Sequence, residues 1–189
     1  MDLFGVFSAF GLSASAGLNA YIPLLSIALL ARFSDLIKLS EPWNMLTSWW
    51  IIGLLIVLSL VEFLADKIPA VNHINDIVMT FVRPAAGAIA FAASAQVITD
   101  VHPLLSLGLG LVVAGGVHTV KSAAIRPVVT ATTGGAGNVP VSIAEDIISM
   151  IVSIISVVLP VLMACLLILA TAFIIWWLWR RSRRTALTM

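Results

Sequence analysis

Charged residues and cysteines are scarce in this chain. Charged side chains make up 10% of its 189 residues, whereas soluble domains carry roughly 25%. The one cysteine, Cys165, excludes an internal disulfide and a cysteine-based metal cluster. The net charge is only +1, and the chain has no basic patch with interleaved aromatic residues, so nucleic acid is not expected as a partner.

Apolar sequence, by contrast, is abundant. The chain is 61% hydrophobic and its mean hydropathy is +1.13. A helix needs about 20 apolar residues to cross the hydrocarbon core of a bilayer, and several runs of this chain are that long. We therefore predict an all-α integral membrane protein, a polytopic helical bundle whose immediate partner is the lipid bilayer. At this length we expect a single membrane domain, 1–189, with no separate soluble domain.

The apolar runs predict about six spans. The first run, Leu3 to Ala31, would be about 44 Å long as one helix, so we expect an interruption at Gly17-Leu18-Asn19-Ala20-Tyr21-Ile22-Pro23, where glycine and proline weaken a helix. Residues 72–76 are expected to form a polar link. The other spans are predicted at about 49–65, 77–99, 104–122, 141–158 and 161–179. The last two are separated by a turn near Pro160; a single long tilted helix, and hence five spans, is the alternative.

The two halves of the chain resemble each other. Gly11-Leu12-x4-Gly17-Leu18-Asn19 aligns with Gly110-Leu111-x4-Gly116-Val117-His118, and Ser59-x-x-Glu62 aligns with Ser142-x-x-Glu145. Three spans in each half would invert the second copy. We therefore predict two inverted three-helix repeats, 1–100 and 101–180, with interrupted first helices and a basic tail, 181–189. Inverted repeats are typical of transporters, whose site lies between the repeats.

Polar residues inside the apolar runs are the candidate site. Ionisable residues within a membrane are rare and mark ion pathways. Glu62 and Glu145 would bind a proton or cation as coupling ion, and Arg83 would balance charge. The predicted ion- or substrate-binding set is Asn19, Glu62, Asp66, Arg83, His118, Lys121, Arg126, Asn138, Glu145 and Asp146. The alternative is that these acids pair with basic residues only to hold the fold.

Other chemistries have weaker signals. Arg126 and the Gly/Thr stretch 130–138 could hold a phosphate, as in an anionic lipid head group, although no P-loop spacing follows. No Gly-x-Ser-x-Gly motif occurs, so an enzyme is not favoured. No cofactor is predicted. A metal site made of Glu62, Asp66, His118 and Glu145 is an open alternative that spacing cannot test.

Several motifs are similar to those of a known family. They are Gly17-Leu18-Asn19-Ala20-Tyr21-Ile22-Pro23, Glu62-x3-Asp66-Lys67-x-Pro69, Arg83-Pro84, His118-x2-Lys121-x4-Arg126 and Asn138-x3-Ser142-x2-Glu145-Asp146. With these the chain resembles the DUF4126 family of small bacterial integral membrane proteins over most of its length. The resemblance implies a bacterial membrane protein and the same polar positions. It implies nothing about substrate, because the family has no established function.

These observations favour one function over two alternatives. We expect a small transporter or channel that moves an ion or small solute through a polar site between two inverted repeats. The alternatives are binding, flipping or hydrolysis of a phosphate-bearing lipid, and a membrane scaffold without transport. Arg180, Arg181, Arg183 and Arg184 predict a cytoplasmic C-terminus by the positive-inside rule. We expect a multi-pass protein of the bacterial inner (plasma) membrane that forms a homodimer.

Overall fold

The computed structural model describes residues 3–95 and 102–186. Helix makes up 87% of it, and these ranges contain no strand. Four helices are long and apolar enough to cross a membrane, and three shorter ones are also apolar. The four are Ile74–Ala95, Pro103–Thr133, Asn138–Val158 and Pro160–Trp177. These are the features of a multi-pass helical membrane protein, as the composition predicts.

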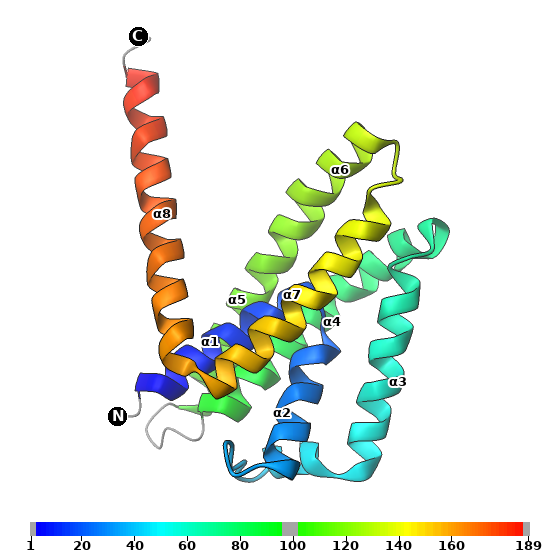
Figure 1. Cartoon of the computed structure of the whole chain (residues 1–189), viewed down its shortest axis with the longest axis vertical. Helices are drawn as coiled ribbons and strands as arrows, with labels where there is room; N and C mark the ends of the chain where they lie inside the picture. Colours follow the sequence, from blue (N-terminus) through cyan, green and yellow to red (C-terminus); the bar gives the residue numbers. More distant parts are fainter. Residues whose placement is uncertain (1–2, 96–101, 187–189) are drawn as a thin grey trace.

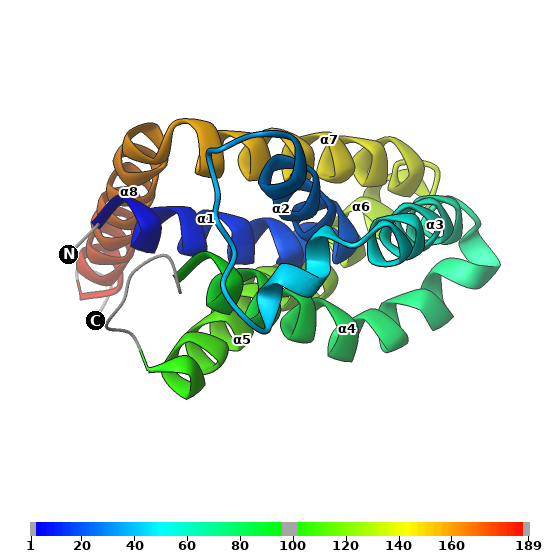
Figure 2. The ribbon, with the colours of Figure 1, turned by 90° about the horizontal axis from the view of Figure 1, so that it is seen from below.

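The helices are arranged around a central group of three. In chain order they are α1 (Leu3–Leu18), α2 (Tyr21–Phe33), the 3-10 helix η1 (Trp43–Thr47), α3 (Trp49–Ala65), α4 (Pro69–Ala95), α5 (Pro103–Val120), the π-helical turn η2 (Lys121–Ile125), α6 (Arg126–Thr133), α7 (Asn138–Val158) and α8 (Pro160–Ala186). The helices α1, α4 and α5 pack together most extensively, and α7 lies against α1 and α2 (Figures 1 and 2). Helix α8 contacts α1 and α7, and then projects away from the bundle (Figure 1).

The first apolar run is interrupted where the sequence predicts. Helix α1 ends at Leu18 and α2 begins at Tyr21. The Asn19 side-chain oxygen accepts hydrogen bonds from the backbone N–H groups of Tyr21 and Ile22, both at 3.1 Å. Asparagine in this position satisfies N–H groups that the start of a helix leaves without partners. The break is therefore a defined structure with its own cap.

Helices α4 and α5 approach closely through glycines. A Cβ built on Gly110 would lie 2.4 Å from the carbonyl oxygen of Gly87, and one on Gly87 would lie 2.2 Å from the Cβ of Ala114. Only residues without a side chain allow backbones to approach so closely. This contact fixes the distance between the helices that carry Arg83, about one turn before Gly87, and His118, about one turn after Ala114.

Serines join α1 to α7. The Ser15 hydroxyl lies 2.7 Å from that of Ser149 and 2.8 Å from that of Ser153, and all three side chains are buried. Hydroxyl contacts between close helices are a common form of packing in membranes. These serines therefore serve helix packing in this structure.

Two predicted boundaries need correction. The polar link at 72–76 is wrong, because α4 begins already at Pro69 and runs through it. Proline favours the first position of a helix, and the polar side chains of Asn75 and Asp76 have partners inside the bundle. The fourth span does not end near Ser122 but continues through η2 and α6 to Thr133. The break between α7 and α8 at Pro160 is confirmed, and residues 96–99 of the third predicted span lie outside the described residues.

Candidate functional site

Two side chains of opposite charge lie at the break between α1 and α2. The carboxylate of Glu62, in the last turn of α3, accepts a hydrogen bond from the Ala20 N–H at 3.0 Å, where α2 begins. The ammonium of Lys121 donates to the carbonyl oxygen of Leu18 at 2.9 Å, where α1 ends. A helix start favours an anion and a helix end favours a cation. Each helix end at the break is therefore paired with a side chain whose charge is opposite to the partial charge of that helix end. One of these side chains comes from each half of the chain.

Arg83 joins this break to α5. Its guanidinium donates to the Glu62 carboxylate through Nε at 3.1 Å and through Nη2 at 3.0 Å, and both side chains are fully buried. Its Nη1 lies 3.0 Å from Nδ1 of His118. The other ring nitrogen of His118 lies 3.3 Å from the Thr80 hydroxyl. Arg83 can therefore lie inside a membrane span because it has a buried partner on each side, Glu62 and His118.

The π-helical turn positions two further cations. Lys121 is its first residue, and Arg126 follows its last. Lys121 Nζ lies 2.9 Å from the Glu145 carboxylate, and Arg126 contacts Asp66 at 3.0 Å, Asp76 at 3.2 Å and Glu145 at 3.5 Å. Single π turns inside α-helices occur frequently at functional sites. Here the turn places both cations against α7.

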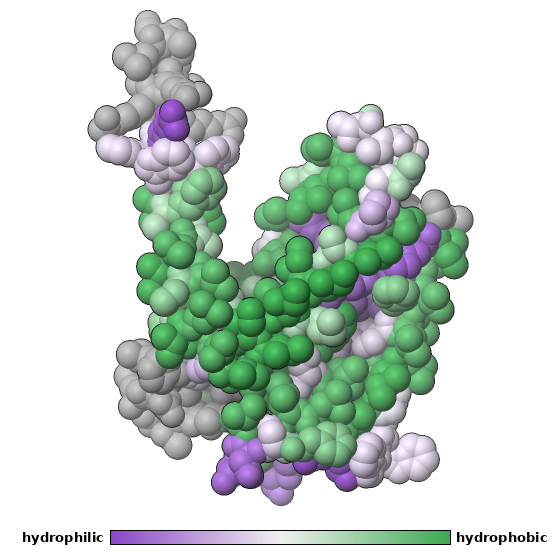
Figure 3. Space-filling model, in the orientation of Figure 1, coloured by the Kyte–Doolittle hydropathy of each residue, from purple (hydrophilic) through white to green (hydrophobic). Residues whose placement is uncertain are grey.

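At the outer edge of the site, Asp146 bridges α7 to the end of α3. It accepts from the Asn19 amide at 3.0 Å and pairs with Lys67 at 3.2 Å. The side chains of Lys67 and Asp146 retain 16% and 10% of their exposure, against 0–2% for Glu62, Asp66 and Arg83. Figure 3 shows a hydrophilic strip between α7 and α3, bordered by apolar surface on both sides. The site therefore approaches the surface on this side.

Together these residues form one charged network. It consists of seven side chains joined by ion pairs, Glu62, Asp66, Asp76, Glu145, Arg83, Lys121 and Arg126, and of the separate Lys67–Asp146 pair beside them. Asp66 is its hub, since its Oδ2 lies within 4 Å of Arg83, Lys121 and Arg126. Asp66 follows α3, outside the membrane-spanning helices. Burial alone would raise the pKa of its carboxyl, but the charges of Lys121, Arg83 and Arg126 outweigh burial and hold that pKa below its ordinary value.

The structure brings together all the predicted site residues except one. Asn19, Glu62, Asp66, Arg83, His118, Lys121, Arg126, Glu145 and Asp146 belong to the network or contact it. Asn138 lies apart, where its amide donates to the Thr130 hydroxyl at 2.9 Å in an exposed part of the chain. Thr132 and Thr133 likewise donate to backbone carbonyls of their own helix. Gly134 and Gly135 adopt positive φ angles of 64° and 92° in the turn to α7.

Sequence reasoning missed Asp76. Its side chain pairs with Arg126, and Asn75 donates to Asp66 at 2.8 Å. The signal was present, because Asp76, Thr80 and Arg83 are spaced by four and three residues and so share one face of a helix. Assigning residues 72–76 to a link removed Asp76 from that face.

A metal site receives no support from the geometry. Among residues 3–95 and 102–186 no three His, Cys, Asp or Glu side chains are placed to hold a metal ion. The carboxylates of Glu62, Asp66 and Glu145 face guanidinium or ammonium groups instead.

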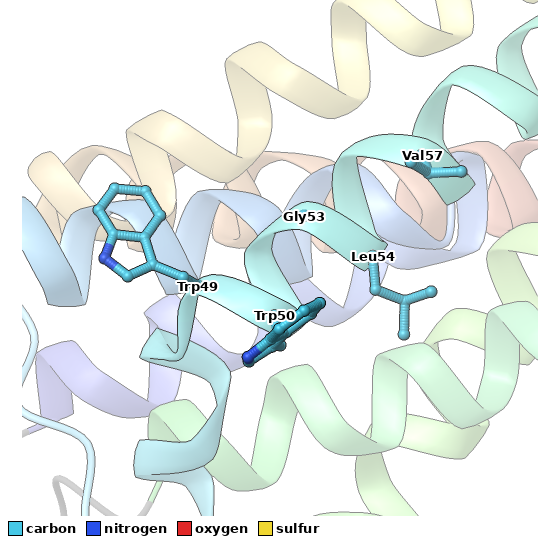
Figure 4. Close-up of a pocket in the computed structure, with 5 residues that line it drawn as sticks. All are labelled: Trp49, Trp50, Gly53, Leu54 and Val57. Atoms are coloured by element: carbon cyan, nitrogen blue, oxygen red, sulfur yellow. The ribbon is translucent and has the colours of Figure 1, made fainter.

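Two surface hollows differ in their relation to the network. One, of about 440 Å³, borders Lys121 and is otherwise apolar, with Leu18, Val117 and Val120 in its wall. The other is an open apolar hollow on α3, lined by Trp49, Trp50, Gly53, Leu54 and Val57 (Figure 4). The second has the character of a lipid-facing surface, because tryptophans near a helix end suit the membrane interface. Only the first lies next to the network.

The comparisons agree with the motifs. A family model described as "Domain of unknown function (DUF4126)" matches residues 6–181. No curated protein and no solved structure is similar enough to match. Because the matched region includes every residue of the network and nearly the whole sequence, the chain belongs to the DUF4126 family.

Proposed function

We propose that this protein is a small multi-pass transporter or channel that moves an ion or small solute through the network. The observation that best supports this proposal is that charged side chains are buried at an interrupted helix. Glu62 lies at the start of α2, and Lys121 lies at the end of α1. Transporters commonly build their ion and substrate sites from such helix ends. Buried charges are costly in a membrane and are usually retained for function.

The order of the helices supports a site between two inverted halves. In each half a first helical stretch is followed by two further helices: α1–α2, α3 and α4, then α5–η2–α6, α7 and α8. The first stretch is broken at Asn19 in the first half, whereas in the second half it is a continuous helix with a π-helical turn. Glu62 comes from the first half and Glu145 from the second, yet a chain of ion pairs through Arg83, Asp66 and Lys121 links them. In this proposal 1–100 and 101–180 are the repeats. A proton or cation is the coupling ion, and no cofactor is involved.

The proposed setting is the bacterial inner membrane, with the basic tail in the cytoplasm and two copies per assembly. Trp176 and Trp177 precede Arg180 at the far end of α8, an order expected where a helix leaves the bilayer on its positive side. The lipid-phosphate alternative has less support, because Arg126 already contacts Asp66, Asp76 and Glu145.

Ion flux in proteoliposomes tests the proposal. A variant with both Glu62→Gln and Glu145→Gln should reduce flux, driven by an imposed proton or sodium gradient, to the rate of protein-free vesicles. The loss is expected because both carboxylates that would bind the ion become neutral. A pH-sensitive or sodium-sensitive dye inside the vesicles gives the readout.

The matched control carries Asp35→Asn and Glu41→Gln. These two acids are exposed in the connection between α2 and α3, so the control removes the same charge outside the network. It should transport like the wild type. Undiminished flux in the Glu62/Glu145 variant would contradict the proposal.

A further inference from the structure

The second half of α3 is attached to the bundle mainly by charged side chains. Within Trp49–Ala65, all of which the structure describes, the buried apolar residues are Ile52 and Leu55 near the start, and Glu62 is the only buried residue after them. Large apolar side chains of the second half are 39–59% exposed, namely those of Leu60, Val61, Phe63 and Leu64. Apolar side chains gain little by leaving lipid for protein. The contacts that hold this end of α3 are therefore mainly polar.

These contacts join the end of α3 to three other helices. Glu62 pairs with Arg83 of α4, and Asp66 pairs with Arg126 of α6, both at 3.0 Å. Lys67 pairs with Asp146 of α7 at 3.2 Å. Among the residues that the structure describes, no ion pair joins this last pair to the other seven charged side chains. It can therefore open without breaking any of their ion pairs.

The Lys67–Asp146 pair bridges the seam between α3 and α7, and each of its members has a second partner. Lys67 Nζ donates to the Phe63 carbonyl oxygen at 3.0 Å and lies 3.1 Å from the centroid of the Phe63 ring. The Asp146 carboxylate accepts from the Asn19 amide at 3.0 Å. When the pair opens, each charge keeps this second partner on its own side of the seam.

Water already reaches this pair. The side chains of Lys67 and Asp146 are 16% and 10% exposed, and the hydrophilic strip in Figure 3 lies between the same two helices. Ion pairs that water reaches contribute little to stability. About one turn before Asp146 on α7, the Ser142 hydroxyl contacts the Asp66 carboxylate at 3.4 Å. A path that begins at this pair therefore reaches Asp66, the hub of the network, within about one turn of helix.

The other approaches to the network suit a charged solute less well. The hollow of about 440 Å³ beside Lys121 is otherwise apolar, and an ion that crossed it would lose the water that solvates it. At the edge between α4 and α6, Asp76 is 22% exposed. Its partner Arg126, however, also pairs with Asp66 and Glu145. That edge cannot open without disturbing the centre of the network.

We infer that the seam between α3 and α7 is the aqueous entrance through which a cation reaches the network, and that the Lys67–Asp146 pair closes it. This deepens the proposed function, on which it rests, by naming the route to the site. When the Lys67 ammonium turns back to the Phe63 carbonyl, the Asp146 carboxylate is left to attract the entering cation. Transporters control access to a central site by moving one part of the bundle against another. Here the moving part is the end of α3.

Cysteine accessibility tests the entrance. Ser142→Cys is introduced into the full chain together with Cys165→Ser, so that the new thiol is the only one present, and the protein is placed in lipid nanodiscs. Ser142 is 0% exposed, so its replacement is reached by water only when the seam opens. The rate of reaction with a water-soluble thiosulfonate, followed by mass spectrometry, measures that opening.

Replacing Lys67 should raise the labelling rate at position 142. Lys67→Met should make labelling about fivefold faster, the factor expected when a partly exposed ion pair is lost. Lys67→Glu should raise the rate further, because a second carboxylate repels Asp146. Lys67→Arg keeps the pair and should label as slowly as the parent. A cationic and an anionic thiosulfonate should both react faster, which distinguishes opening from a change in the local potential.

The matched control is Ser153→Cys, again with Cys165→Ser. Ser153 lies on the same helix, is also 0% exposed, and contacts Ser15 of α1 rather than α3. Its labelling rate should be the same with and without Lys67→Met. An unchanged rate at position 142 in both Lys67→Met and Lys67→Glu would overturn the entrance. So would an equal increase at position 153, or an equal increase at position 142 in Lys67→Arg.

Because labelling needs no gradient and no flux, the two proposals can fail separately. Faster labelling in the Lys67 variants of a protein that shows no flux in vesicles would overturn transport but keep the seam as the aqueous path to the network. Flux in vesicles together with unchanged labelling would keep transport and overturn the entrance.

Discussion

Replacing Arg83 with methionine should lower the free energy of unfolding by about 3–5 kcal/mol, the usual cost of breaking a buried ion pair by removing one partner. Glu62, at 0% exposure, would lose its guanidinium partner and keep the hydrogen bond from the Ala20 N–H. Nδ1 of His118 would also lose its donor. Unfolding of the purified protein in mixed detergent micelles, followed by circular dichroism, measures the loss.

Arg180→Met is the matched control for this prediction. Arg180 is exposed on α8, where it lies over the Trp176 ring and has no part in the network. Exposed substitutions usually change stability by about 0.5 kcal/mol or less. If both variants lost the same free energy of unfolding, the buried Glu62 carboxylate would not need Arg83 as its partner. That result would contradict the described geometry.

Gly110→Ala should destabilise the protein by about 1–3 kcal/mol, as overpacking of a close contact does. The added methyl group would lie 2.4 Å from the Gly87 carbonyl oxygen and 2.7 Å from the Ala88 Cα. Both are backbone atoms, so α4 and α5 must move apart. That movement would also stretch the contact between Arg83 and His118, which these two helices carry.

Gly116→Ala makes the same change on the same helix where no atom lies within 4 Å. Because alanine favours a helix over glycine by about 1 kcal/mol, this variant should be as stable as the wild type or more so. The same detergent unfolding experiment compares the two. If Gly110→Ala were as stable as Gly116→Ala, the close approach of α4 and α5 would be refuted.

The sequence predicts the helical class from its apolar runs, and the break near Asn19 from helix length together with glycine and proline. It predicts most of the network for a different reason, because a charged or amide side chain in an apolar background is costly alone and such residues are expected to meet. Glu62, Arg83 and Glu145 could be selected on that ground without knowing which helices are neighbours. The turn at Pro160 follows from helix length in the same way.

The pairing within the network could not be predicted, because it depends on tertiary placement. Lys121 and Arg126 are five residues apart, and the π-helical turn that sets their relative direction has no clear sequence signal. Asp76 was missed because polar residues at a helix start resemble a loop in sequence. Asn138 was selected because it is polar, but it begins α7 and bonds to Thr130 away from the network.

In the proposed function the buried charges serve ion movement rather than the stability of the fold. One variant separates these two roles. Combining Glu62→Gln with Arg83→Met removes a carboxylate and a cation together, so the net charge of the network is unchanged. Glutamine can still accept from the Ala20 N–H. Replacing both members of a buried pair by well-packed groups is often nearly neutral, so most of the stability lost in Arg83→Met should return.

Flux of this paired variant in proteoliposomes is therefore the most direct measurement. We expect a protein that folds with close to wild-type stability and transports no faster than protein-free vesicles. A paired variant that is equally stable and transports at the wild-type rate would contradict it, because the Glu62–Arg83 pair would then serve the fold alone.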